Sequence, residues 1–248
     1  MDKIRVGAVS YLNTKPLLYG LEHAPVHNEI ELLIDYPARV AAMLMDGRID
    51  VGLVPVAVIP KLKEAHVITD YCIGADGPVA SVCLFSEVPV DQIKMVYLDY
   101  QSRTSVNLAK ILLREYWKQP VTFMETTGED FRSRIGGTTA AVVIGDRALE
   151  QRSRSNFIYD LSEAWKKHTG LPFVFAAWVS NKKLPFSFVE KFNEANALGL
   201  QNLEAVLKTL QFPAFPLRDY FTKYLSYSLN KTKFEAMQLF LERINKMQ

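Results

Sequence analysis

The sequence lacks the patterns that mark many common enzyme classes. It has only two cysteines and four histidines among 248 residues. Cys72 and Cys83 stand in apolar, strand-like surroundings without metal-ligand spacing, which predicts buried thiols. His23 and His27 have the spacing of a helical metal pair, but Pro25 between them opposes a helix. The G-x-S-x-G, P-loop and G-x-G-x-x-G patterns are also missing, so metal, triad and nucleotide chemistry are not expected.

Long apolar runs and an excess of one charge are missing as well. No run approaches the roughly twenty apolar residues that span a bilayer, and the start of the chain shows no signal-peptide pattern. The 29 basic and 27 acidic residues leave a formal net charge of +2. The basic residues are scattered and form no patch for nucleic acid. We therefore expect a cytoplasmic protein without membrane or nucleic-acid partners.

What is present is an alternation of strand-like and helical segments, which is typical of α/β proteins with parallel strands. Strands are expected over residues 3–9, 31–36, 51–56, 66–73, 79–85, 95–100, 121–125, 140–144 and 171–179. Helices are expected between many of them, for example over 104–117. From residue 186 to the end the pattern is helical, with no strand candidate.

The order of these segments predicts two lobes joined by two crossings of the chain. Residues 79–87 and 173–180 are the natural crossing segments. We therefore assign residues 1–86 and 179–248 to one lobe and 87–178 to the other. Ligands commonly bind between domains, so the site is expected in the cleft between these lobes.

Polar residues follow several of the expected strands, at the sheet edge where open parallel sheets bind ligands. This set comprises Asn13, Thr14, Ser102, Thr104, Ser105, Gly145 and Asp146, and Ser81 lies near the first crossing. The segment from Gln101 to Ser105 fits two structures equally well. It is either an anion site at a helix start, or an ordinary N-cap with Arg103 in solvent.

Six motifs in chain order, over about residues 4–178, resemble the chorismate dehydratase family of the futalosine route to menaquinone. They are SYLNTKPL at 10–17, DVGLVP at 50–55, GPVASV at 77–82, SRTSV at 102–106, IGD at 144–146 and TGLPFVF at 169–175. The resemblance implies a type-2 periplasmic-binding-protein-like fold. It also implies elimination of water from chorismate to give 3-enolpyruvylbenzoate, without metal or organic cofactor.

The resemblance further implies roles for single residues. Asn13 would hydrogen-bond the leaving hydroxyl or the enolate, and Ser81 would position the enolpyruvyl group. The substrate-binding set would be Ser10, Thr14, Ser102, Arg103, Thr104, Ser105, Gly145 and Asp146, with the backbone amides of Thr104 and Ser105 holding a carboxylate. No motif supplies an evident His, Glu or Lys base. The hypothesis is therefore that a substrate carboxylate removes the proton, with Asp146 as the competing base.

Other functions fit the same scaffold, among them a ligand-sensing domain of a regulator, although no helix-turn-helix pattern is seen. A non-catalytic module that binds a small carboxylate would share the fold, and fold alone does not separate it from an enzyme. The sister dihydroxynaphthoate synthase of the same pathway also shares the fold, but its motifs differ from the one at residues 10–14. The sequence leaves the oligomeric state open.

Overall fold

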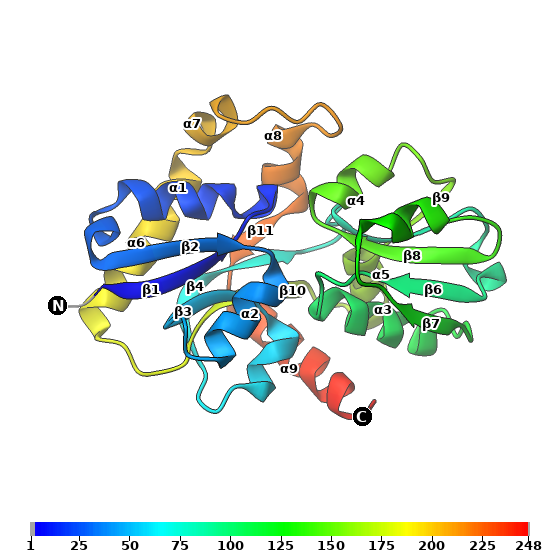
Figure 1. Cartoon of the computed structure of the whole chain (residues 1–248), viewed down its shortest axis with the longest axis horizontal. Helices are drawn as coiled ribbons and strands as arrows, with labels where there is room; N and C mark the ends of the chain where they lie inside the picture. Colours follow the sequence, from blue (N-terminus) through cyan, green and yellow to red (C-terminus); the bar gives the residue numbers. More distant parts are fainter. Residues whose placement is uncertain (1–2, 248) are drawn as a thin grey trace.

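Two mixed β-sheets, each covered by helices, build the protein as two lobes (Figure 1). The computed structural model describes residues 3–247. Within them the larger sheet has the order β11-β4-β10-β3-β1-β2 and the smaller sheet the order β7-β6-β8-β5-β9. The larger sheet comprises β1 (Ile4–Val9), β2 (Ile30–Asp35), β3 (Val51–Pro55), β4 (His66–Ala75), β10 (Phe173–Ser180) and β11 (Ser226–Ser228). The smaller sheet comprises β5 (Val82–Ser86), β6 (Met95–Leu98), β7 (Thr122–Glu125), β8 (Thr139–Ile144) and β9 (Phe157–Asp160).

Helices pack on both sheets and connect their strands. The α-helices are α1 (Lys15–His23), α2 (Pro37–Met45), α3 (Thr104–Glu115), α4 (Asp146–Gln151), α5 (Leu161–Thr169), α6 (Phe186–Gln201), α7 (Leu203–Lys208), α8 (Leu217–Asp219) and α9 (Lys231–Asn245). Short 3-10 segments are η1 (Leu12–Thr14), η2 (Pro25–Glu29), η3 (Val56–Lys61), η4 (Val90–Gln92) and η5 (Glu129–Arg134), and η6 (Tyr220–Tyr224) is π-helical. No helix within residues 3–247 combines the length and the apolar character needed to cross a membrane.

The strands that follow the two crossings, β5 and β10, run antiparallel to both of their neighbours. β1 pairs in parallel with β2 and β3, and β6 pairs in parallel with β7 and β8. β5 runs antiparallel to its neighbours β8 and β9, and β10 runs antiparallel to β3 and β4. The expected α/β class is thus confirmed, while both sheets are mixed instead of wholly parallel.

Strand pairing also bears on where the lobes divide. β5 belongs to the smaller sheet and β10 to the larger one, so pairing favours a division just before Val82 and just before Phe173. The predicted boundaries, residues 1–86 with 179–248 and residues 87–178, remain a proposal for the folding units. Helix α9 packs against β10 and η3 of the larger lobe and against α3 of the smaller one.

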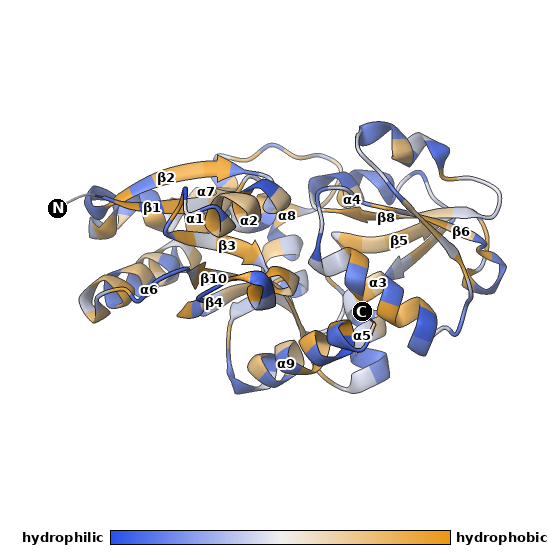
Figure 2. Ribbon diagram, turned by 60° about the horizontal axis from the view of Figure 1, so that its bottom comes forward, coloured by the Kyte–Doolittle hydropathy of each residue, from blue (hydrophilic) through white to orange (hydrophobic). Residues whose placement is uncertain are grey.

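Apolar side chains fill the space between sheets and helices, as the hydropathy colouring of the strands shows (Figure 2). Near the second crossing, the rings of Trp165, Phe173 and Phe240 meet edge to face, with centroids 5.0 to 6.1 Å apart. These rings come from α5, β10 and α9, and all are fully buried. Such edge-to-face contacts add to the hydrophobic burial that joins α5, β10 and α9 near the crossing.

Most expected strands and helices are confirmed within a few residues, but the tail differs from its prediction. Residues 226–228 form the edge strand β11 beside β4, although the whole tail was expected to be helical. A three-residue strand is too short to show the alternation by which strands are recognised. The strand β9 was also not anticipated. Both cysteines are buried and unpaired, as predicted.

Candidate active site

The candidate site is a small cavity of about 50 Å³ between the two lobes. Its polar lining consists of Tyr11, Asn13, Thr14, Ser81, Ser102, Thr104, Ser105 and Gly145. Seven of these eight residues were predicted from the sequence, and Tyr11 was not. Sites for drug-sized ligands usually enclose about 300 to 1,000 Å³. With the lobes in this position, the cavity is therefore too small for a ligand of that size.

Three helices begin at or next to residues that line this cavity. Thr14 immediately precedes α1, Pro37 is the first residue of α2, and Thr104 is the first residue of α3; all three line the cavity. The N-terminus of a helix carries partial positive charge from the helix dipole. The lining therefore favours an anionic ligand without using a charged side chain.

Asn13 offers an amide donor to the cavity. The Thr14 hydroxyl donates to Asn13 Oδ1 at 3.0 Å, and the Tyr227 hydroxyl donates to the Asn13 carbonyl at 2.8 Å. These contacts fix both the side chain and the backbone of Asn13. Within residues 3–247, Asn13 Nδ2 donates to no protein atom, so its two hydrogens are free for a ligand.

Ser81, in the first crossing, lines the same cavity as Asn13. It lies just before β5, where its carbonyl accepts a hydrogen bond from Gly145 N at 2.8 Å. Its hydroxyl accepts one from Tyr220 at 2.8 Å, and both side chains are almost fully buried. Ser81 is thus held at its backbone by one lobe and at its side chain by the C-terminal segment.

The loop that carries Ser81 is strained and is held by a buried carboxylate. Ala80 has a φ of +62°, a conformation that residues with a side chain rarely adopt. Asp160 Oδ2 accepts from Val79 N at 2.9 Å and from Ala80 N at 2.7 Å. Burial raises the pKa of Asp160 to about 6, and its backbone donors oppose that rise. Asp160 therefore holds the conformation that presents Ser81.

The segment before α3 forms the expected N-cap, with Arg103 exposed, and a role in anion binding stays a prediction. Ser102 Oγ accepts from Ser105 N at 3.0 Å, which is a capping bond on the first turn of the helix. Thr104 Oγ1 accepts from Ala57 N of the other lobe at 3.2 Å. The Ser105 amide is therefore engaged within the protein, while all three hydroxyl-bearing side chains still line the cavity.

Three predicted site residues lie outside the cavity lining. Ser10 and Arg103 are exposed. Asp146 is the first residue of α4, and its carboxylate accepts a hydrogen bond from Leu12 N at 3.0 Å across the lobes. Burial raises the pKa of Asp146 to about 6. The lining residues within 3–247 include no carboxylate, imidazole or amine.

Gly145 is a position where a side chain would disturb the site. Its φ is +65° and its ψ is −148°, a region that is essentially restricted to glycine. A Cβ built on Gly145 would lie 3.0 Å from the ring of Tyr11. The glycine therefore lets the two lobes approach closely beside the cavity.

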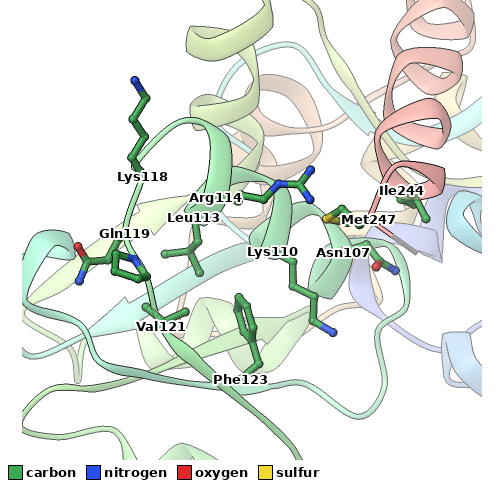
Figure 3. Close-up of a pocket in the computed structure, with 11 residues that line it drawn as sticks. Asn107, Lys110, Leu113, Arg114, Lys118, Gln119, Val121, Phe123, Ile244 and Met247 are labelled. Carbon is green, nitrogen blue, oxygen red and sulfur yellow. The ribbon is translucent and has the colours of Figure 1, made fainter.

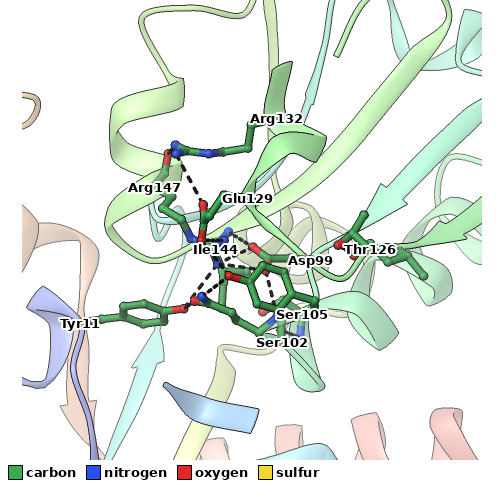
Figure 4. A network of polar contacts seen from close by, with 12 residues as sticks. Tyr11, Asp99, Ser102, Ser105, Thr126, Glu129, Arg132, Ile144 and Arg147 are labelled. Carbon is green, nitrogen blue, oxygen red and sulfur yellow. Dashed lines mark hydrogen bonds and ion pairs between the residues drawn. The ribbon is translucent and has the colours of Figure 1, made fainter. Parts of the chain in front are cut away.

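A polar network that the sequence did not reveal joins the lobes through Tyr11, which lines the cavity (Figure 4). The Tyr11 hydroxyl donates to Gln101 Oε1, and Arg147 Nη2 lies 3.5 Å from the same hydroxyl. Arg147 Nη2 also pairs with both oxygens of the buried Asp99 at 2.9 Å. The position of Arg147 directly after the IGD motif was the one available signal. Together with the bond between Leu12 and Asp146, this network bridges the closed lobes.

A larger hollow of about 780 Å³ lies elsewhere, between α3 and the end of α9 (Figure 3). Its basic side chains are Lys110, Arg114 and Lys118, above apolar groups such as Phe123. Arg114 is paired with Glu115, and Lys110 lies 3.7 Å from a Glu125 oxygen. None of the predicted site residues lines this hollow, so it is not the candidate active site. Residues 3–247 contain no cluster of His, Cys, Asp and Glu side chains suited to a metal ion.

Comparison with known proteins gives consistent results over nearly the whole chain. The model of a family described as menaquinone biosynthesis matches residues 4–246. A chorismate dehydratase of Thermus thermophilus is 28% identical over 77% of this chain and 80% of its own. One from Campylobacter jejuni is 25% identical over 95% of both chains. A Candida albicans protein described as having the generic periplasmic binding protein fold superposes with a TM-score of 0.65 at 13% identity, covering 100% of this chain and 90% of its own. The expected periplasmic-binding-protein-like fold is confirmed.

Proposed function

The chain belongs to the menaquinone biosynthesis family, and on that premise we propose that it is a chorismate dehydratase. The proposed reaction removes the C4 hydroxyl and the C3 proton of chorismate as water and yields 3-enolpyruvylbenzoate. Formation of the aromatic ring supplies the driving force. The predicted cytoplasmic location and the absence of a cofactor stay parts of this proposal.

The observation that carries the proposal is the neutral, anion-favouring lining of the interlobe cavity. Chorismate has two carboxylates, and three helix N-termini meet at this cavity. The free amide of Asn13 would donate to the leaving hydroxyl or to the enolate oxygen, where negative charge develops. Ser81 would hold the enolpyruvyl group in the orientation that elimination requires.

The lining also supports a proton transfer in which the substrate provides the base. Asp146 is the only acid among the predicted site residues, but its carboxylate is engaged by Leu12 N and lies outside the lining. Asp146→Asn keeps an oxygen that can accept from Leu12 N. We therefore expect this substitution to lower kcat by no more than roughly fivefold, whereas loss of a general base lowers kcat by about 10²- to 10⁴-fold. Loss of turnover with intact chorismate binding would instead make Asp146 the base.

The direct test is incubation of the purified, metal-depleted protein with chorismate, followed by mass spectrometry and ultraviolet absorbance. Loss of one water and a new benzoate chromophore would support the dehydratase. Asn13→Ala and Ser81→Ala should then each lower kcat/KM by on the order of 100-fold, as loss of a transition-state donor typically does. Ser133→Ala, an exposed serine of the smaller lobe, serves as the matched control. Chorismate that binds but stays intact would replace the dehydratase with the non-catalytic binding module.

A further inference from the structure

A tyrosine outside the cavity lining contacts one of the two proposed catalytic residues. Tyr220 begins η6, a π-helical turn. Such turns are rare in proteins overall, and those that occur are often found at functional sites. Its side chain is completely buried, and its ring packs edge to face against Phe215 with centroids 6.1 Å apart. The Tyr220 hydroxyl lies 2.8 Å from Ser81 Oγ. Tyr220 therefore reaches the site only through Ser81.

The direction of this hydrogen bond follows from acidity and surroundings. A phenol donates a hydrogen bond more strongly than an alkyl hydroxyl because the phenol is the stronger acid. Burial raises the pKa of Tyr220, which keeps the phenol protonated. Within residues 3–247 the Ser81 hydroxyl has no other hydrogen-bond partner. When Ser81 Oγ accepts from Tyr220, its own proton is left to point into the cavity that Ser81 lines.

We infer that Tyr220 is a positioning residue that fixes Ser81 as a hydrogen-bond donor toward an oxygen of the bound substrate. The identity of that substrate, chorismate, rests on the proposed function. Without the Tyr220 hydroxyl, Ser81 Oγ loses the contact that selects one of its staggered rotamers and one direction for its proton. The donor is then no longer aligned with the substrate before binding.

The test is a double-mutant cycle of Tyr220→Phe and Ser81→Ala with chorismate as substrate. Tyr224→Phe is the matched control because Tyr224 ends the same π-helical turn and also packs on Phe215, but its hydroxyl makes no hydrogen bond within residues 3–247. For each variant, kcat/KM, the chorismate dissociation constant and the thermal midpoint are measured. The cycle separates coupling through Ser81 from a general loss of stability.

We expect Tyr220→Phe to lower kcat/KM by about tenfold in the wild-type background and by less than about twofold beside Ser81→Ala. Tyr224→Phe should match the wild type. An equal loss in both backgrounds, or no loss in either, would overturn the inference, whatever the change in thermal midpoint. If the wild type binds chorismate without turnover, the proposed reaction fails separately. The same cycle in dissociation constants then decides whether Tyr220 acts through Ser81.

Discussion

The carboxylate of Asp160 provides the sharpest test of how the fold builds the site. Its two oxygens accept hydrogen bonds from four backbone N–H groups, two in the loop that carries Ser81 and two in the first turn of α5. Oδ2 accepts from the Ser81 loop at Val79 N and Ala80 N, and Oδ1 accepts from Ser162 N and Glu163 N at 3.1 Å, which caps α5. Asp160→Asn keeps the shape but replaces one acceptor with an NH₂ donor that faces two N–H groups. One pair of hydrogen bonds must therefore be lost.

The magnitude follows from those two lost bonds. Hydrogen bonds to a charged group contribute about 1.5 to 3 kcal/mol each, and part of that is retained by relaxation, so we expect a loss of about 3 kcal/mol in the free energy of unfolding. For a chain of this size, each kcal/mol lowers the thermal midpoint by about 2 to 4 °C. The midpoint should therefore fall by roughly 6 to 12 °C.

Activity should change together with stability, because the same carboxylate holds Ala80 in its strained conformation. Relaxation of Ala80 displaces Ser81, so kcat/KM for chorismate should fall by at least about tenfold, since small misplacements of a reacting group are costly. Asp91→Asn, at an exposed position of η4, is the control and should leave both quantities unchanged. A destabilised Asp160→Asn variant with wild-type kcat/KM would mean that the pair on α5 is the one lost. Asp160→Ala removes both pairs, so wild-type kcat/KM in that variant would refute the reasoning that this carboxylate positions Ser81.

The remaining predictions concern single contacts around the site. Gly145→Ala should cost about 2 to 3 kcal/mol of stability in urea unfolding and lower kcat/KM, because the added Cβ meets Tyr11 in a glycine-only conformation. Gly137 also has a positive φ, +53°, but open space surrounds it. Gly137→Ala should therefore lower the free energy of unfolding by only about 1 kcal/mol and leave the kinetics unchanged. Equal effects of the two substitutions would contradict the argument. Lys233→Met removes the buried ammonium that donates to the two main-chain carbonyls flanking Tyr227. Urea unfolding should show that the free energy of unfolding falls by about 3 kcal/mol. A change under about 0.5 kcal/mol would be inconsistent with that role. Burial raises the pKa of Asp146 to about 6 in the folded protein, so the stability that Asp146 contributes is present at low pH and is lost as pH rises through 6. When the pH is lowered from 7.5 to 5, the free energy of unfolding of the wild type should therefore increase relative to that of Asp146→Asn. Parallel plots of unfolding free energy against pH for the two proteins would refute this.

The sequence predicted those parts of the site that local pattern controls. Asn13 and Thr104 follow apolar strands and start helices, and each signal lies within a few neighbouring residues. These residues accordingly line the cavity. Ser10 and Arg103 stand in the same motifs but are exposed. A motif places a residue at the end of a strand, whereas the direction of its side chain depends on the exact backbone turn that follows.

The tyrosines that support the two proposed catalytic residues were beyond local reasoning. Tyr220 and Tyr227 lie 139 and 214 positions away from Ser81 and Asn13. Their surroundings, a π-helical turn and a three-residue edge strand, have almost no sequence signature. One constraint on these tyrosines can still be stated in advance, because a buried phenol needs a hydrogen-bond partner. The sequence can therefore state that a tyrosine in an apolar tail will find a polar partner, while only the packing of the tail across both lobes decides which one. In this fold the tail packs against both Asn13 and Ser81, through Tyr227 and Tyr220. The tail carries none of the six motifs, yet it supports the two residues on which the proposed reaction depends.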